Sequence, residues 1–186
     1  MADTTDFRNG FTMLLEGEIF SISEFQHVKP GKGNAFVRTK LKNVETGAVL
    51  DRTFRSNDKV EEVRVEKREM QFLYAEGDVY NFMDLETYDQ IGIDLQIVGD
   101  SNAGLLKESE NAFVRTAQGR TIGVELPNFV TLSVTHTEPG LKGDTATGAV
   151  KSATLETGAL VNVPLFVNQG DVLKIDTRTG GYVERV

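Results

Sequence analysis

The sequence of 186 residues contains no cysteine, no tryptophan and only two histidines. Without cysteine, the chain can form neither a disulfide framework nor a thiolate metal site. His27 and His136 lie far apart, and no HExxH or other recognisable metal-ligand spacing surrounds them. We therefore expect neither a metal nor a cofactor.

Long apolar runs are also missing from the sequence. No segment approaches the roughly 18 consecutive apolar residues that a membrane-spanning helix needs. The first residues, MADTTDFRNGFTMLL, lack the basic stretch and following apolar stretch of a signal peptide. We expect a cytoplasmic protein that does not bind a membrane.

Recognisable catalytic motifs are absent as well. The sequence has no GxSxG nucleophile turn, and GKGNAF lacks the third glycine of a dinucleotide-binding fingerprint. GDTATGAVK lacks the GK[ST] ending of a phosphate-binding loop. Acidic pairs such as Glu61 and Glu62 are typical of solvated charge. We expect no catalytic residue and no enzyme, and an enzyme that uses the acidic middle of the chain is the weakest alternative.

Charge is plentiful but unevenly distributed along the chain, whose formal net charge is -8. Residues 1–63 hold 9 basic and 10 acidic side chains, residues 64–127 hold 6 and 12, and residues 128–186 hold 5 and 6. The acidity therefore lies mostly in the middle third. Net acidity argues against indiscriminate binding to nucleic acid, because such binding depends on neutralising phosphates.

Short alternating apolar runs separated by glycine-containing turns predict an all-β chain. The clearest run covers residues 35–42, where one face is mainly apolar and the other mainly cationic: Ala35, Val37, Thr39 and Leu41 against Phe36, Arg38, Lys40 and Lys42. The spacing of the runs predicts three consecutive small β-barrels, at residues 1–63, 64–127 and 128–186.

One segment favours a helix instead. Residues 101–110, SNAGLLKESE, predict a turn or two of helix with Ser101 or Asn102 as the N-cap. Leu105 and Leu106 are expected to face inward.

A lysine between two glycines is the most unusual feature of the basic first third. KPGKGN at residues 29–34 predicts the turn of a β-hairpin with Lys32 near its tip. Gly31 and Gly33 allow close approach to another surface, and Pro30 restricts one arm of the loop. With the cationic strand that follows, this pattern indicates a partner of dense negative charge, above all RNA. The alternative is an ordinary solvated turn lysine.

Three blocks of the sequence resemble the bacterial elongation factor P family. FQHVKPGKGNAFVRTKLKN at residues 25–43 is similar to the first-domain hairpin of that family. TEPGLKGDTATG at residues 137–148 and KSATLETGALVNVPLFVNQGD at residues 151–171 are similar to its C-terminal signatures. The resemblance implies a KOW-like, SH3-like barrel followed by two oligonucleotide-binding (OB-fold) barrels, in an L-shaped, tRNA-like outline.

The resemblance also implies a function. Family members are translation elongation factors that bind both ribosomal subunits between the peptidyl and exit tRNA sites and promote peptide-bond formation at consecutive prolines. By that pattern Lys32 contacts the CCA end of peptidyl-tRNA. The tip is supported by Lys29, Pro30, Gly31, Gly33 and Asn34. Contacts to the RNA backbone, including ribosomal RNA, are expected of Arg38, Lys40 and Lys42. The small subunit and mRNA are expected near Gly143, Asp144, Thr145, Ala146 and Thr147.

Two further implications concern partners and relatives. Lys32 is compatible with a lysine-type extension or with none, so a Lys32-modifying enzyme is an implied partner of an otherwise monomeric chain. Asn34 departs from the proline of some relatives, which affects the expected stiffness of the loop. The paralogous elongation factor P-like proteins are one alternative. A general single-stranded nucleic-acid-binding OB-fold protein is another, disfavoured by the absence of tryptophan and by the acidic middle third.

Overall fold

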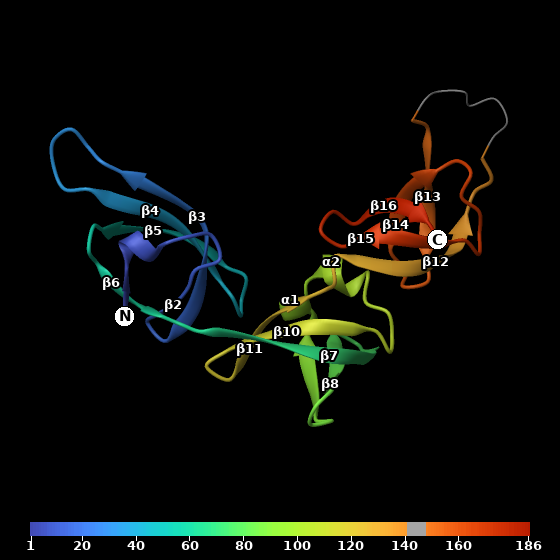
Figure 1. Ribbon diagram of the computed structural model, residues 1–186, viewed down its shortest axis with the longest axis horizontal. Coiled ribbons are helices and arrows are strands. Elements are labelled where there is room, and N and C mark those ends of the chain that lie inside the picture. The colour runs from blue at the N-terminus through green and yellow to red at the C-terminus, as the bar shows by residue number, and fades with distance from the viewer. Residues whose placement is uncertain (141–147) are drawn as a thin grey trace. The chain divides into compact units, whose positions relative to one another are not determined.

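The computed structural model describes residues 1–140 and 148–186, and strands dominate this part of the chain. Hydrogen bonds join the strands into three sheets, with the orders β1-β6-β2-β3-β4-β5, β11-β10-β7-β8-β9 and β14-β13-β12-β15-β16 (Figure 1). The predicted all-β fold is confirmed. Among the described residues, no helix is long and apolar enough to cross a membrane.

The first sheet is built from β1 (Ala2–Asp3), β2 (Thr12–Leu15), β3 (Glu18–Val28), β4 (Phe36–Asn43), β5 (Val49–Arg55) and β6 (Lys59–Glu62), with a short 3-10 helix at Thr4–Asp6. The second contains β7 (Val65–Glu76), β8 (Val79–Asp84), β9 (Gln90–Asp94), β10 (Asn111–Ala117) and β11 (Arg120–Glu125). The third contains β12 (Phe129–Thr137), β13 (Val150–Leu155), β14 (Leu160–Pro164), β15 (Val172–Asp176) and β16 (Gly181–Arg185).

The predicted alternation in β4 is confirmed. Val37, Thr39 and Leu41 are buried, whereas Arg38 and Lys42 are exposed. Because successive side chains of a strand point to opposite faces, β4 contributes one face to the core of the first sheet and leaves the other to solvent. That core also contains Phe11, Met13, Ile22 and Phe54.

The strand β3 carries a β-bulge opposite β4. Ile22 pairs with Leu41 and Glu24 pairs with Lys40, so Ser23 is an extra residue without a partner in the ladder. The Ser23 hydroxyl donates to the Lys40 carbonyl at 3.0 Å. A bulge changes which residues of a strand share a face. It brings Glu24 to the exposed face beside Lys40.

The prediction of a helix at residues 101–110 was wrong in its bounds. The helical residues form two single turns, α1 (Leu95–Val98) and α2 (Asp100–Ala103), separated by Gly99 at a φ of 85°. Gly99, rather than Ser101 or Asn102, is the N-cap of α2. The Asn102 side chain instead donates to the carbonyls of Val98 at 3.0 Å and Val124 at 2.7 Å.

The two leucines that were predicted to face inward lie just beyond the end of α2. Leu105 and Leu106 face inward, as predicted, but they follow the helix rather than form part of it. Both of their backbone N–H groups donate to the Asn102 carbonyl at 3.0 Å, so a hydrogen-bonded turn follows α2.

The chain forms two compact units: unit 1 is residues 1–68 with 114–123, and unit 2 is residues 69–113 with 124–186. Unit 1 thus includes the hairpin between β10 and β11, whose Ala117 and Ile122 pack against Ile19 and Val63. Arg120 of this hairpin donates to the Gly17 carbonyl at 3.3 Å.

Within unit 2, a polar clamp joins the segment after α2 to the third sheet. The Glu156 carboxylate accepts a hydrogen bond from the Ser133 backbone N–H at 2.9 Å and lies 3.2 Å from the Lys107 ammonium. The Thr157 hydroxyl donates to the Gly104 carbonyl. The Ser133 hydrogen bond is the main cause that lowers the pKa of Glu156 below its ordinary value of 4.5.

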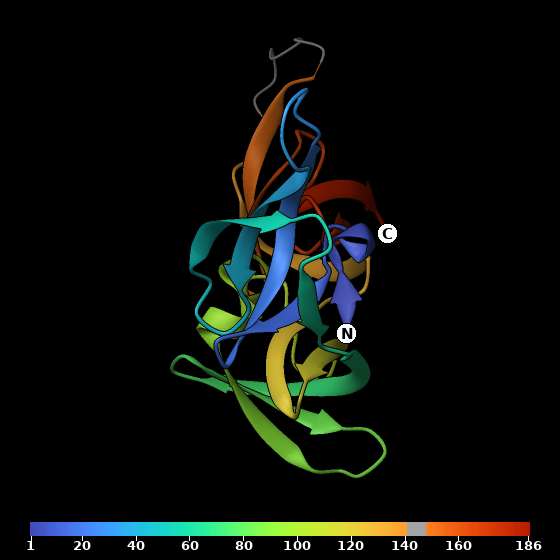
Figure 2. The same ribbon diagram turned by 90° about the vertical axis from the view of Figure 1, so that its left-hand side faces the viewer.

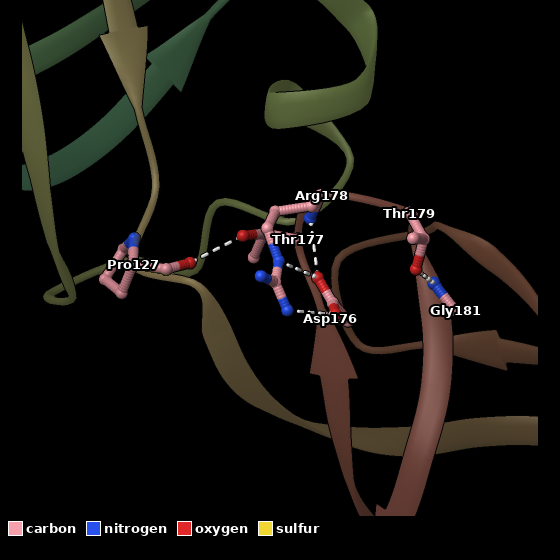
Figure 3. A network of polar contacts seen from close by, with 6 residues as sticks. All are labelled: Pro127, Asp176, Thr177, Arg178, Thr179 and Gly181. Atoms are coloured by element: carbon pink, nitrogen blue, oxygen red, sulfur yellow. Dashed lines mark hydrogen bonds and ion pairs between the residues drawn. The ribbon is translucent and has the colours of Figure 1, made fainter.

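A second polar network in unit 2 fixes the turn between β15 and β16 (Figure 3). Arg178 binds both carboxylate oxygens of Asp176, at 2.8 and 3.0 Å, and this contact lowers the pKa of Asp176. The Thr177 hydroxyl donates to the Pro127 carbonyl at 2.6 Å. The turn is therefore tied to the segment that leads into β12.

The inward and outward faces of β4 can be tested with neighbouring substitutions. Leu41→Ala removes a side chain with no exposed surface and should lower the free energy of unfolding by about 2–5 kcal/mol. Lys42→Ala, one position along, should change it by less than about 0.5 kcal/mol. Chemical denaturation measures both, and equal losses at the two positions would contradict the assignment of faces.

The Glu156 clamp predicts a pH-dependent stability. A lowered pKa means that the ionised form stabilises the fold above pH 4.5 and that this contribution is lost as pH falls through the lowered value. Glu156→Gln should therefore cost about 0.5–1 kcal/mol at neutral pH. The difference from wild type should shrink in acid. Denaturation at several pH values measures it, with the exposed Glu61→Gln as control, and a difference independent of pH would refute the clamp.

Candidate nucleic-acid interface

The candidate site is the hairpin of β3 and β4. The two strands pair antiparallel from Phe20 with Asn43 to Val28 with Phe36, so residues 29–35 form the connecting loop. Figure 1 shows this hairpin extending beyond the rest of its sheet, and Figure 2 shows the same projecting loop after a quarter turn. The predicted hairpin with Lys32 in its turn is therefore present.

The two glycines of the loop have different roles. Gly33 has a φ of 111°, a backbone conformation that side chains disfavour, and a Cβ added there would lie 3.9 Å from the Pro30 side chain. Gly31 does not adopt positive φ, and no atom lies within 4 Å of an added Cβ. Gly33 is thus required by the turn itself, whereas Gly31 leaves free space beside the lysine.

Lys32 is fully available to a partner. Residues 29–34 are all exposed. Within residues 1–140 and 148–186, no hydrogen bond or ion pair engages the Lys32 side chain. At the end of the loop, the Ser56 N–H donates to the Ala35 carbonyl at 3.0 Å. An ammonium group offers three hydrogen-bond donors, so this tip can bind an anionic or carbonyl-rich surface.

The three predicted backbone-contacting cations share the exposed face of β4 but have different surroundings. Arg38 lies over the Phe36 ring, with its guanidinium carbon 5.6 Å from the ring centroid. Lys40 forms an ion pair with Glu24 at 3.2 Å. Lys42 pairs in the ladder with Ser21 on one side and Val49 on the other.

An open groove of about 510 Å³ lies along this hairpin and the adjoining strand. Its lining residues come from β3, β4 and β5, namely Glu24, Phe25, Gln26, Arg38, Thr39, Lys40, Asp51, Arg52 and Thr53. Charges of both signs are present, so the groove is not uniformly cationic.

Sequence reasoning missed one cation on the same face. Arg55 pairs with Phe36 in the ladder between β4 and β5, and directly opposed residues share a face. The alternation in VLDRTFR would have placed Arg55 together with Thr53 and Asp51. Only the register of β5 against β4 shows that this face adjoins Arg38.

The second predicted contact region lies outside the described residues. Gly143, Asp144, Thr145, Ala146 and Thr147 all lie there. At its flank, the Lys151 ammonium donates to the Glu138 carbonyl at 2.6 Å. A Cβ on Gly140 would come within 2.8 Å of the Leu165 carbonyl oxygen, so a glycine is required for this close approach.

The described residues were also compared with the requirements of a metal-binding site. Residues 1–140 and 148–186 contain no group of three or more His, Cys, Asp or Glu side chains that could hold a metal ion.

Three family models match consecutive parts of the chain. Residues 3–60 match the elongation factor P KOW-like domain, residues 65–124 the elongation factor P OB domain, and residues 130–185 the elongation factor P C-terminal domain. These matches confirm the predicted KOW-like and OB-fold classes.

Individual relatives are similar over their full length. Elongation factor P of Pelotomaculum thermopropionicum is 59% identical over 186 residues, and that of Moorella thermoacetica is 57% identical over 185 residues, with 100% of each chain covered. A solved structure of eukaryotic translation initiation factor 5A from Methanococcus jannaschii matches with a TM-score of 0.55 at 22% identity, covering 66% of this chain and 92% of that chain. This last likeness shows a shared fold.

The ion pair of Lys40 can be measured by a double-mutant cycle. Glu24→Gln and Lys40→Gln should show a coupling energy of about 0.2–1 kcal/mol, the usual range for an exposed pair. Chemical denaturation at low and high salt checks it, because salt should weaken the coupling. Lys42→Gln combined with Glu24→Gln is the control and should show no coupling. A coupling of zero for the Glu24 and Lys40 pair would contradict the ion pair.

Proposed function

Because this chain belongs to the elongation factor P family, we propose that it acts between the peptidyl and exit tRNA sites and promotes peptide-bond formation at consecutive prolines. The chain is a translation elongation factor, and factors of this family associate with the ribosome. The observation that carries the finer proposal is the exposed Lys32 on a projecting hairpin, with no partner among the described residues.

The proposed mechanism is positioning rather than chemical catalysis. Proline reacts slowly because its ring fixes φ, so the reacting groups seldom reach attack geometry. A cationic tip that holds the CCA end of peptidyl-tRNA would reduce the entropic part of the barrier. Contacts to sugar and phosphate position a nucleic acid without reading its sequence, which suits a factor that acts on any peptidyl-tRNA.

The remaining assignments belong to the same proposal. Lys29, Pro30, Gly31, Gly33 and Asn34 shape and support the tip. Gly143, Asp144, Thr145, Ala146 and Thr147 face the small subunit and mRNA. The protein acts as a cytoplasmic monomer without catalytic residues or cofactor, and its domains are residues 1–63, 64–127 and 128–186. Its partners are peptidyl-tRNA, ribosomal RNA and, where the tip is extended, a Lys32-modifying enzyme.

Lys32→Ala tests the proposal directly. Losing a charge-assisted hydrogen bond of about 1.5–3 kcal/mol should slow peptide-bond formation at consecutive prolines by about ten-fold or more. The measurement is the time to full-length product in a reconstituted translation reaction whose template encodes three consecutive prolines. The fold should be intact by circular dichroism, since Lys32 is exposed.

Two controls make the result specific. Lys59→Ala removes an exposed lysine from β6 and should leave the rate unchanged. A template with three alanines in place of the prolines should show no dependence on the factor. Equal rates for Lys32→Ala and wild type on the proline template would refute the proposed function.

A further inference from the structure

The exposed face of β3, β4 and β5 is organised in cross-strand rows. Because directly paired residues share a face, the register defines each row from β3 through β4 to β5. From the loop inward, the rows are Val28, Phe36 and Arg55; Gln26, Arg38 and Thr53; Glu24, Lys40 and Asp51; Ser21, Lys42 and Val49.

The row of Lys40 has a net negative charge. Glu24 lies on one side of Lys40 at ion-pair distance, and Asp51 is its ladder partner on the other side. A phosphate approaching this row would meet two carboxylates and one ammonium that is already paired. Lys40 is therefore poorly placed to bind RNA, even though it belongs to the cationic stripe of the sequence.

The two rows nearest the loop each have a net positive charge. Arg38 and Arg55 are both exposed, and within the described residues neither guanidinium forms an ion pair. No acidic side chain belongs to either row. Arg38 is further oriented by its contact with the Phe36 ring.

The spacing of these arginines suits a single anion. Arg55 lies opposite Phe36, and Arg38 is two residues along the same strand face, so the two are diagonal neighbours. Diagonal neighbours of an antiparallel pair lie about 7–8 Å apart, within reach of long side chains. Guanidinium groups bind phosphate oxygens in a planar, two-pronged geometry that lysine does not offer.

We infer that Arg38 and Arg55 form a clamp for one phosphate of an RNA backbone, and that Lys40 is a structural residue that neutralises Glu24. The inference rests on the proposed function, since it takes the hairpin to face RNA on the ribosome. It adds Arg55 to the binding surface and assigns the Lys40 position a different role.

Salt dependence of binding tests the clamp. The fluorescently labelled full-length chain is titrated with ribosomes that carry peptidyl-tRNA, at several KCl concentrations and constant Mg²⁺. Each lost phosphate contact should reduce the slope of log Kd against log salt by about 0.7–1. Arg55→Gln and Arg38→Gln should each reduce the slope by this amount. The double variant should reduce the slope by less than the sum of the two single reductions, because both arginines bind one phosphate.

Matched substitutions separate the clamp from general charge loss. Lys59→Gln removes an exposed cation from β6, which contributes no residue to the groove beside the hairpin. This variant should leave the slope unchanged. The double substitution Glu24→Gln with Lys40→Gln, which does not alter the net charge, should also leave the slope unchanged. A wild-type slope for Arg55→Gln overturns the clamp. That result would leave the proposed function intact, because the function is judged by Lys32→Ala on the proline template.

The chemical nature of the occupant can be established with a tethered probe. The chain has no cysteine, so Thr53→Cys provides a unique attachment point in the Arg38 row. A hydroxyl-radical-generating iron chelate at this position should cleave tRNA or ribosomal RNA in the complex. The same chelate at Lys59→Cys, on β6 and outside the groove, should cleave that RNA less. Scission of a ribosomal protein with the RNA intact would show that a protein occupies the face and would overturn the inference.

Discussion

The functional hairpin depends on one constraint, the β-bulge at Ser23. Without the extra residue, strict alternation would place Glu24 on the same face as Ile22 and the core. With it, Glu24 lies beside Lys40, while Gln26 and Val28 join the exposed face of Arg38 and Phe36. The bulge therefore decides which charges of β3 meet the cationic face of β4. The charge pairing between β3 and β4 follows from that register.

This arrangement explains how an acidic chain can present a local site for an anion. Lys40 is neutralised by Glu24, whereas Lys32 and Arg38 near the loop and Lys42 further along β4 form no ion pair within the described residues. A uniformly basic face would attract any nucleic acid, because phosphate neutralisation carries no sequence information. Limiting the available cations to one face of a projecting hairpin favours a partner of matching shape and disfavours bulk RNA.

Sequence reasoning predicted the features that depend on local pattern and missed those that depend on pairing. Alternation located β4 and its buried Leu41, and turn chemistry located Lys32. The register that brings Arg55 beside Phe36 joins residues 19 positions apart, which no local pattern specifies. The helix at residues 101–110 was misplaced because the Asn102 side chain binds the distant Val124 carbonyl instead of capping. The predicted roles of the site residues remain predictions.

Unit 1 is completed by a segment that is synthesised late. Ile19 and Val63 are covered by Ala117 and Ile122, which lie 55 and 60 residues beyond Glu62, the last residue of β6. During translation of its own message, this apolar surface stays uncovered until the hairpin of β10 and β11 has left the exit tunnel. Burial of that surface is then coupled to synthesis of the second sheet. A chain cut after β6 would leave the apolar surface of Ile19 without the cover that Ala117 and Ile122 provide.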